Sequence, residues 1–421
     1  MEKRIVKIII KEKQEQILKI KLQERPIFLE DKCNYVFVGI RRAGKSFLMF
    51  QRILSLIKKG EALIENILYI NFEDERIANI KSEELGVIID SYRELYDYEP
   101  IVFLDEIQNV DGWEKFARRL ADSGYRLYIT GSNAKMLSRD IATTLGGRFI
   151  IKEVFPFSFS EFLQIKGVEL DKNWEFGSVR NKVVQLWEEY FYFGGLAESF
   201  DLVDKRGWLN SLYQKVLFGD IVARNAIRNE EAIRLLSKKL AESVMQPTTQ
   251  SRLQHIVSSS GAKASRSTII DFLKYMRDAY LIFGISNYTD SITEKESSQK
   301  RYFFDNGILN IFLVDGNTKL LENVVAIDLL KEYGLGDLFY YNRNVEVDFF
   351  VPREKLAIQV SFDISDDATF NRETRALVKL SKAFELQRAV IITSNEESEV
   401  EVDGLTIEVI PVWKWVLAYS L

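Results

Sequence analysis

The segment GIRRAGKS, residues 39–46, places two glycines, a lysine and a serine at the spacing G-x-x-x-x-G-K-S. Glycines let a short loop fold tightly enough for backbone N–H groups to point at phosphate oxygens, and the lysine charge can bridge the β- and γ-phosphates. The serine hydroxyl is suited to Mg²⁺, and the positive end of a following helix attracts phosphate further. A chance match is expected in about one or two per cent of chains this long. The segment therefore predicts a P-loop that binds ATP with Mg²⁺.

A pair of acids follows an apolar run further along the chain. In IVFLDEIQ, residues 101–108, four apolar residues precede Asp105 and Glu106. Asp105 can hold Mg²⁺ through water, and Glu106 can orient or deprotonate the attacking water. An ordinary strand with a solvated acidic end would look the same. The P-loop before it favours the catalytic interpretation.

Two further sites carry polar residues that could act on the γ-phosphate. YITGSN ends in Ser132 and Asn133, which are suited to sensing the γ-phosphate or the attacking water, and equally suited to capping the helix predicted over NAKMLSRDIATTL. Arg148, in LGGRF, precedes another strand. It can reach the γ-phosphate of a neighbouring subunit and stabilise transition-state charge, or be a surface arginine after a glycine turn.

The residues expected to bind ATP are Gly39, Arg42, Gly44, Lys45, Ser46, Phe47, Ser132 and Asn133. Those expected to act in catalysis are Lys45, Asp105, Glu106 and Arg148. Ser46 and Asp105 are expected to hold Mg²⁺.

The segment VEVDFFVPREKLAIQVS, residues 345–361, reads as two strands joined by a turn. One type of metal-dependent nuclease places an acid on the first such strand and Glu-x-Lys on the second. Here Asp348 supplies the acid, but neutral Gln359 and Ser361 occupy the other two places. Asp363 lies about 13 Å past Gln359 along an extended chain, too far to substitute. The hairpin predicts a nuclease-like fold that has lost its chemistry, unless Glu322 or Glu346 has taken over the missing role.

The elements around these residues predict an α/β protein. Short apolar runs separated by amphipathic stretches such as residues 45–59 and 112–124 are typical of a parallel sheet covered on both faces. The expected strands are residues 35–40, 66–73, 101–107, 126–132 and 148–155. Residues 160–250 are expected to be mostly helical, and a strand–helix pattern resumes after about residue 320.

Residues 251–288 predict a helix, a turn of small residues, a second helix and a strand, and KRYFFDNG would complete a β-wing. This pattern favours a winged helix-turn-helix. Residues 251–279 carry five Lys or Arg against two acids. Both DNA contact and a plain docking role stay open. His255, the single histidine, is expected to be packed or exposed rather than a ligand.

Composition limits the remaining possibilities. The chain has 421 residues, 47% of them hydrophobic, and 57 basic against 62 acidic residues give a net charge of −5. Two or three domains are expected, and nucleic acid could bind only through a local basic patch. The single cysteine, Cys33, excludes an internal disulfide and fits a reducing cytosol. With no apolar run of about eighteen residues, we expect a cytoplasmic protein with no membrane partner.

Ten segments together resemble one prokaryotic family of AAA-type P-loop ATPases, which have a winged-helix segment and a C-terminal nuclease-like domain of unknown function. They are GIRRAGKS, NFED, FLDEIQNVDGWE, ITGSN, LGGRF, PFSFSEF, FGGLAES, YFFDNGILN, LENVVAIDLL and EVDFFV. The resemblance implies ATP binding through Gly39, Gly44, Lys45 and Ser46, acidic roles for Asp105 and Glu106, and an ordered role for Arg148. It implies no substrate.

We therefore expect an AAA-type ATPase domain over residues 1–155, a helical lid and winged-helix region over 156–318, and an inactive restriction-endonuclease-like α/β domain over 319–421. Three functions stay open. The first is an ATPase that remodels DNA or a protein partner, acting as a homo-oligomer if Arg148 works in trans. The second is a slow ATP-dependent signalling switch that acts by partner binding. The third, ranked last, is an ATP-dependent metal nuclease.

Overall fold

The computed structural model describes residues 2–137 and 139–418, which form two compact units. The N-terminal unit comprises residues 1–155 and 278–280, and the C-terminal unit comprises residues 156–277 and 281–421. Across the described residues, none of the helices combines the length and the apolar character needed to cross a membrane.

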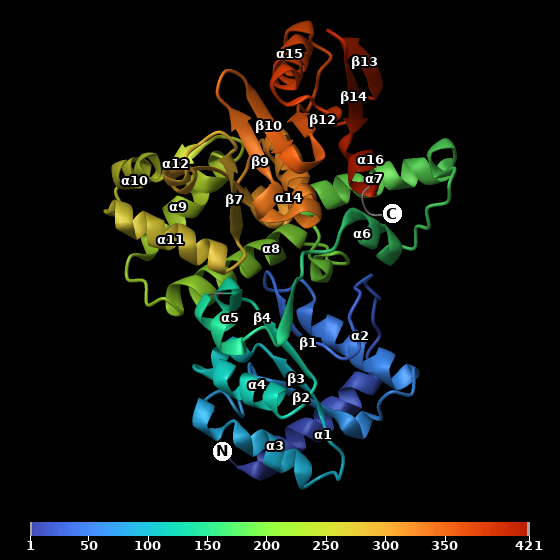
Figure 1. The fold of residues 1–421 in the computed structure, drawn as a ribbon, viewed down its shortest axis with the longest axis vertical. Coiled ribbons are helices and arrows are strands. Elements are labelled where there is room, and N and C mark those ends of the chain that lie inside the picture. Colours follow the sequence, from blue (N-terminus) through green and yellow to red (C-terminus); the bar gives the residue numbers. More distant parts are fainter. Residues whose placement is uncertain (1, 138, 419–421) are drawn as a thin grey trace. The chain divides into compact units, whose positions relative to one another are not determined.

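A five-stranded parallel sheet forms the centre of the N-terminal unit, in the order β2-β3-β4-β1-β5 (Figure 1). Its strands are β1 Asn34–Val38, β2 Ile67–Asn71, β3 Ile101–Asp105, β4 Leu127–Gly131 and β5 Phe149–Glu153. Every residue of β3 and β4 is buried, as expected for central strands with both faces covered. The five strands expected from the sequence are confirmed to within a few residues at their ends.

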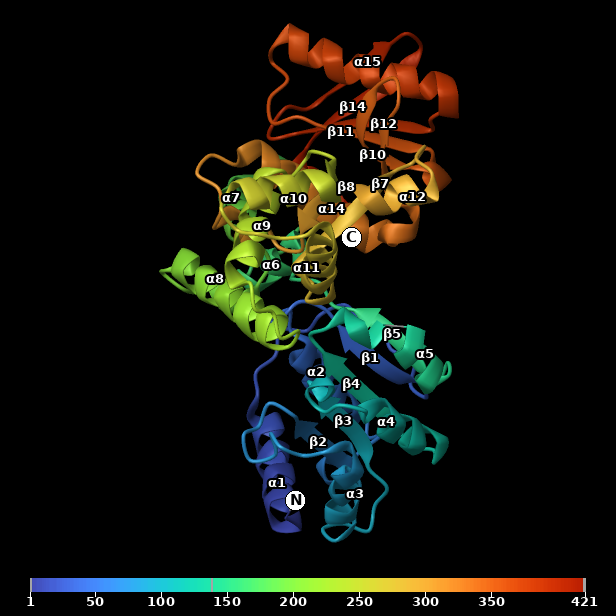
Figure 2. The same cartoon turned by 90° about the vertical axis from the view of Figure 1, so that its left-hand side faces the viewer.

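Helices flank this sheet on both faces (Figure 2). They are α1 Lys3–Lys19, α2 Lys45–Lys58, α3 Gly86–Arg93, α4 Trp113–Asp122 and α5 Arg139–Leu145. Helix α4 shows why they pack: Trp113, Phe116, Ala117 and Leu120 recur at helical spacing and are buried. Helix α1 packs beside the edge strand β2 and was not anticipated from the sequence.

The parallel arrangement decides which loops meet. The carboxyl ends of β1, β3 and β4 lie at one edge, so the segments that begin at Gly39, Glu106 and Ser132 emerge together. Arg148 precedes β5, which runs parallel to β1, and its carbonyl accepts a hydrogen bond from Asn34 at the start of β1. Arg148 therefore lies at the opposite edge of the sheet.

The C-terminal unit combines helices with a nine-stranded sheet of order β13-β14-β12-β11-β10-β9-β7-β8-β6. Its helices are α6 Phe159–Ile165, α7 Ser178–Phe193, α8 Lys205–Gln214 with a wider continuation over Lys215–Ala223, α9 Glu230–Glu242, α10 Gln250–Ser259, α11 Arg266–Asp278, α12 Ile292–Ser297, α13 Asn306–Asn310, α14 Asn317–Asp337, α15 Asp367–Phe384 and α16 Val412–Ala418. Its strands are β6 Thr248–Thr249, β7 Ile282–Asn287, β8 Ser298–Phe303, β9 Phe339–Asn342, β10 Glu346–Val351, β11 Leu356–Val360, β12 Arg388–Thr393, β13 Ser398–Val402 and β14 Leu405–Pro411.

One end of this sheet belongs to the segment interpreted as a winged helix. Strand β8 pairs antiparallel with both β6 and β7, and α9, α10 and α11 precede β7 in the chain. This order agrees with the predicted helix–turn–helix and wing, although the winged-helix identity itself stays a prediction. Strand β7 also pairs with β9, so the sheet continues across the expected boundary between residues 318 and 319.

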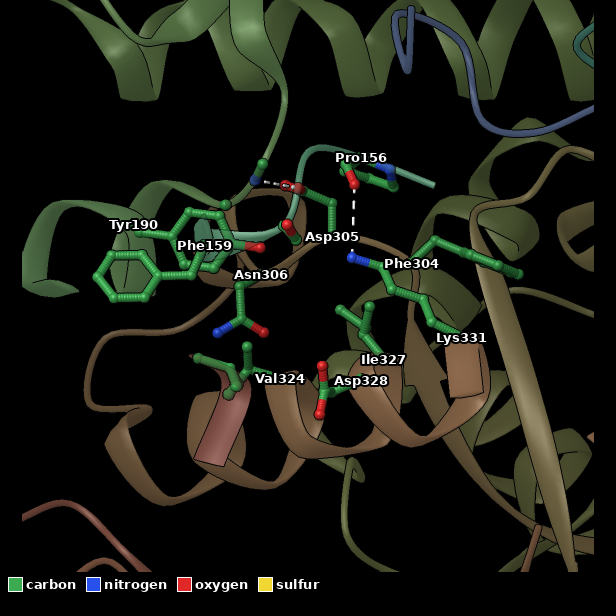
Figure 3. A pocket seen from close by; sticks show the side chains of 14 residues that line it. Pro156, Phe159, Tyr190, Phe304, Asp305, Asn306, Val324, Ile327, Asp328 and Lys331 are labelled. Carbon is green, nitrogen blue, oxygen red and sulfur yellow. Dashed lines mark hydrogen bonds between the residues drawn. The ribbon is translucent and has the colours of Figure 1, made fainter. Parts of the chain in front are cut away.

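A small pocket marks the point where PFSFSEF, FGGLAES, YFFDNGILN and LENVVAIDLL meet (Figure 3). Asp305 accepts hydrogen bonds from the backbone N–H groups of Gly195 (2.8 Å) and Ile308 (3.1 Å). Lys331 donates to the carbonyl of Pro156 at 3.5 Å. Burial raises the pKa of Asp305 to about 6. Its volume is about 20 Å³, which is room for about one water. We therefore interpret this node as a place where the four segments pack together rather than as a ligand site.

Gly195 provides a test of this node. A Cβ atom at Gly195 would lie 2.1 Å from the carbonyl oxygen of Phe157, so Gly195→Ala must displace backbone. Overpacking of this kind costs about 1–3 kcal/mol, and we expect a lower urea midpoint for unfolding of the full chain. Gly177→Ala is the control, because its Cβ would meet nothing within 4 Å. Equal midpoints for the two variants would contradict the packing role.

Candidate nucleotide-binding site

The loop between β1 and α2 holds the backbone conformation that its glycines allow. Gly44 has φ +93° directly before α2, in the left-handed region that favours glycine. A Cβ atom on Gly39 would lie 2.1 Å from the carbonyl oxygen of Val154, so only glycine permits this approach. Arg25 spans the loop and the chain after β5, because its Nη1 donates to the carbonyls of Ala43 (3.0 Å) and Phe155 (3.1 Å).

Lys45 opens helix α2 with its ammonium group at the loop. Its side chain is 3% exposed, and Nζ donates to the carbonyls of Gly39 (3.1 Å) and Ile40 (3.0 Å). Nζ also lies 3.8 Å from Glu106 Oε1. A buried cation at a helix N-terminus, beside a tightly folded loop, is the arrangement that binds phosphate.

Asp105 ends β3 as a fully buried carboxylate with four hydrogen-bond donors. Oδ1 accepts from Ser46 (3.0 Å) and from the hydroxyl of Thr130. Oδ2 accepts from the hydroxyl of Tyr69 (2.5 Å) and the amide of Asn71 (3.1 Å). These bonds offset the cost of burying the carboxylate and fix its orientation.

The environment of Asp105 fits a magnesium site. Burial, reinforced by the neighbouring Glu106, raises the pKa of Asp105. A cation near this carboxylate would oppose that shift. Mg²⁺ prefers hard oxygen ligands and usually keeps several waters. The Ser46 hydroxyl and the Asp105 carboxylate supply such oxygens side by side, so these residues fit the ion.

Glu106 adopts a left-handed backbone conformation, with φ +54°, immediately after β3. Its N–H donates to Thr130 Oγ1 at 2.9 Å, and its Oε2 accepts from the Gln108 amide at 2.5 Å. Burial by itself would raise the pKa of Glu106, but the Lys45 charge and the Gln108 hydrogen bond oppose it, and the pKa is lowered. The carboxylate is therefore ionised at neutral pH and can accept a proton.

Ser132 and Asn133 follow β4 at the same edge and are both buried. Gln108 Nε2 lies 3.4 Å from Ser132 Oγ, so one amide connects Ser132 with Glu106. The structure thus brings Ser132 beside the acid. The helix that these residues were expected to cap includes residue 138, which lies outside the described residues, and the choice between cap and sensor stays open.

Two segments of the chain match known family models. Residues 31–163 match a family model described as an AAA domain, and residues 184–319 match a domain of unknown function, DUF8612. Uncharacterized protein MJ1544 of Methanocaldococcus jannaschii is 35% identical over 400 residues, 91% of this chain and 88% of the relative. An uncharacterized protein of Haemophilus influenzae is 30% identical over 407 residues, 94% and 97% of the two chains.

This chain belongs to the same family as those two proteins. Its AAA domain supports ATP binding. The Walker-type ATPase PABY2304 of Pyrococcus abyssi is 16% identical with a TM-score of 0.38, covering 72% of this chain and 95% of that one. The Orc1 protein of Aeropyrum pernix, solved with DNA, is 14% identical with a TM-score of 0.29, covering 72% and 90%. These two likenesses are too low to carry an argument.

The family's AAA domain contains site residues that the sequence did not single out. Tyr69, Asn71 and Thr130 all bond to Asp105, and Gln108 bonds to Glu106. Tyr69 and Asn71 alternate along β2, which pairs with β3 so that Asn71 lies opposite Asp105. Their polar side chains near the end of an apolar strand were the available signal.

Three further residues were expected to act at this site. Arg148 pairs with Asp122 at the opposite edge of the sheet, so it can serve only a neighbouring copy. Arg42 takes a left-handed conformation, φ +70°, within the loop. Phe47 is 50% exposed on α2 and packs edge-on against Phe50. Roles for all three in ATP binding or hydrolysis stay predictions.

The hairpin expected at residues 345–361 is formed by β10 and β11, and its nuclease-like identity stays a prediction. Gln359 does not face outward: its Oε1 accepts from the N–H of Asp348 (2.8 Å), and its Nε2 donates to Glu373 (2.7 Å). Ser361 donates to the carbonyl of Asp363 at 3.0 Å. Within residues 2–137 and 139–418, no group of three or more His, Cys, Asp or Glu side chains is arranged to hold a metal ion.

Lys45→Ala is expected to reduce ATP affinity at least a hundredfold, because it removes the buried cation that faces the phosphates. Lys58→Ala, at the exposed end of the same helix, is the control and should bind like the wild type. A fluorescent ATP analogue titrated into nucleotide-free protein measures both. Near-equal affinity in the two variants would refute the assignment of Lys45.

Proposed function

We propose that the protein hydrolyses ATP with Mg²⁺ and uses the reaction to drive or switch a conformational change in a process that involves DNA or a protein partner. The observation that carries this proposal is the juxtaposition of Ser46, Asp105 and an ionised Glu106 at the mouth of the P-loop. A phosphate-binding loop alone would support binding. The ionised carboxylate beside it supports hydrolysis.

The residues divide the work between binding and orientation. On ATP binding, Lys45 exchanges its bonds to Gly39 and Ile40 for phosphate oxygens, and the loop N–H groups donate to the same phosphates. Ser46, and Asp105 through water, would hold Mg²⁺, which would supply positive charge beside the phosphates. Thr130 and Tyr69 keep the Asp105 carboxylate in place throughout.

Glu106 supplies the base. Its carboxylate orients the attacking water and accepts its proton, which requires that the residue be ionised before attack. Positioned general bases of this kind contribute about 10²–10⁴-fold to a rate. The Gln108 amide, which reaches both Glu106 and Ser132, is placed to hold the same water from a second side.

A slow nucleotide switch is the second candidate function. The contacts that Glu106 makes with Gln108 and Lys45 favour it. The Glu106 carboxylate is bonded to Gln108 at 2.5 Å and lies 3.8 Å from Lys45. Those contacts must loosen before the carboxylate can take up a water. An enzyme whose base is held in this way would hydrolyse ATP slowly. It would keep the nucleotide bound for a long time, and the bound state could act as the signal.

The basic segment over residues 251–279 is the surface that we propose for a DNA or protein partner. All five of its cations are exposed, while its apolar side chains Leu253, Val257, Ile269 and Met276 are buried. The cations are Arg252, Lys263, Arg266, Lys274 and Arg277. The segment also carries Asp271 and Asp278, so its excess of positive charge is three; an exposed excess of this kind attracts a polyanion and gives binding that weakens with salt. His255 is also exposed there.

Glu106→Gln is expected to bind ATP like the wild type and to lower its turnover about 10²–10⁴-fold, because an amide cannot accept the proton. Glu83→Gln, an exposed acid on the same unit, is the control and should keep full turnover. Phosphate release measures turnover, and filter binding measures bound ATP. Wild-type turnover in Glu106→Gln would sink the assignment of the base.

The same wild-type measurement separates the two candidate functions. Turnover below about once a minute selects the switch, whereas rates in the usual enzyme range select a working ATPase. Adding duplex DNA at low and at high salt then tells whether the partner is a polyanion.

Arg148→Ala is expected to lower hydrolysis by 10-fold or more without changing ATP affinity, if the guanidinium acts on a neighbour's γ-phosphate. Arg118→Ala is the matched control, because Arg118 also pairs with Asp122 but faces no phosphate in this proposal. Mixing Arg148→Ala with Glu106→Gln chains should restore part of the activity, since a mixed interface joins an intact arginine to an intact base. A monomeric protein with full activity would exclude this role.

A further inference from the structure

Lys300 on β8 lies at the centre of a group of carboxylates in the C-terminal unit. Its Nζ lies 2.8 Å from Asp348 Oδ1, 3.3 Å from Glu346 Oε1 and 3.5 Å from Glu322 Oε1. Three carboxylate oxygens therefore surround one cationic point. They come from two elements, β10 for Asp348 and Glu346 and α14 for Glu322.

Lys300 and Glu322 form the buried part of this group, whereas the side chains of Asp348 and Glu346 are 15% and 51% exposed. The Lys300 side chain is 1% exposed, and Glu322 is completely buried. Glu322 Oε1 also accepts from the hydroxyl of Tyr302 at 2.6 Å, but Oε2 has no hydrogen-bond partner among the described residues. Burial raises the pKa of Glu322 to about 7 even though Lys300 opposes the shift. One oxygen of each acid thus lies within 3.5 Å of the ammonium, and Glu322 Oε2 is the buried oxygen of the group left without a hydrogen bond among the described residues.

These three acids are the ones that the sequence indicated as candidates for a nuclease-like centre. Asp348 is the acid on the first strand of the hairpin, and Glu322 and Glu346 are the two residues that could replace the lost one. A divalent cation is bound by several oxygens that converge on one point at about 2.0–2.6 Å. Here the three acids face the Lys300 ammonium at 2.8, 3.3 and 3.5 Å, longer than metal–oxygen distances, so the residues do not fit a metal as they are arranged.

We propose that Lys300 takes the place of a divalent cation in the C-terminal unit, and that removing its charge uncovers a metal site formed by Asp348, Glu346 and Glu322. An ammonium group offers three N–H donors and one positive charge, which is enough to hold the three acids together without a metal. The wing strand β8 is thereby bonded to β10 and α14. This proposal is independent of ATP hydrolysis.

The competing role for Lys300 is that of a nuclease lysine, which would activate water beside a bound metal. A lysine in that role must reach a substrate. Lys300 is almost completely buried, and its Nζ is committed to three carboxylates. The geometry therefore favours a cation that replaces the metal over one that assists it.

Lys300→Met keeps an unbranched side chain that is one atom shorter and removes the charge. We expect the full-length, nucleotide-free variant to bind about one Mn²⁺ more per chain than the wild type, with at least tenfold higher affinity, measured by electron paramagnetic resonance of free Mn²⁺. Mn²⁺ should also raise its thermal unfolding midpoint above that in EDTA. The matched control is Lys300→Met/Asp348→Asn, which should lose both effects because it lacks the central carboxylate.

Three results would overturn the proposal. The first is a folded Lys300→Met protein that binds no additional Mn²⁺. The second is wild-type protein that already binds Mn²⁺ at this centre and loses it in Asp348→Asn. The third is Mn²⁺-dependent cleavage of DNA or RNA by the wild type that disappears in Asp348→Ala, since Lys300 would then serve a working nuclease.

Loss of the cation leaves buried carboxylates unpaired, so Lys300→Met can fail to fold in EDTA. Refolding with Mn²⁺ is then the measurement, and rescue by Mn²⁺ supports the proposal. If the variant stays unfolded in Mn²⁺, Lys300→Met/Glu322→Gln replaces it, because it carries one buried charge fewer and keeps an oxygen ligand at residue 322. Mn²⁺ binding by this double variant supports the proposal, and its absence overturns it.

Discussion

The buried carboxylate of Asp105 is the point on which the N-terminal unit depends. A carboxylate taken out of water must be fully hydrogen-bonded, and Asp105 meets this requirement with donors from three other elements: Ser46 of α2, Tyr69 and Asn71 of β2, and Thr130 of β4. Each donor fixes its own element at the carboxyl edge of the sheet. The interaction that aligns the strands is therefore also the one that orients the acid that we propose as a Mg²⁺ ligand.

Much of this unit follows from the sequence. The strands are short apolar runs, the loop has glycine at Gly44, where φ is +93°, and at Gly39, where another backbone approaches, and the acids end a buried strand. Such signals are local. The sequence did not single out Tyr69, Thr130 and Gln108, because their roles depend on which strands become neighbours. The strand order β2-β3-β4-β1-β5 is decided by crossover connections rather than by any single segment.

The C-terminal unit shows the same limit more strongly. The hairpin, its flanking helices and the helix–turn–helix were all predictable as elements from periodicity. That β7 and β9 pair, and so join the two regions in one sheet, was not, because only Ser286 and Asn287 form the link. Lys300 was missed for the same reason: it precedes Asp348 by 48 residues, and only the fold brings the two together.

Arg25 gives the phosphate-binding loop a direct connection to the rest of the chain. One guanidinium nitrogen bonds both to Ala43, inside the loop, and to Phe155, the residue at which the chain leaves the N-terminal unit. A loop that closes around phosphate and moves the Ala43 carbonyl must either carry Arg25 with it or release it. In both cases the constraint on the peptide leading to Pro156 changes. A single side chain thus ties the position of the Ala43 carbonyl inside the loop to that of the Phe155 carbonyl at the end of the N-terminal unit.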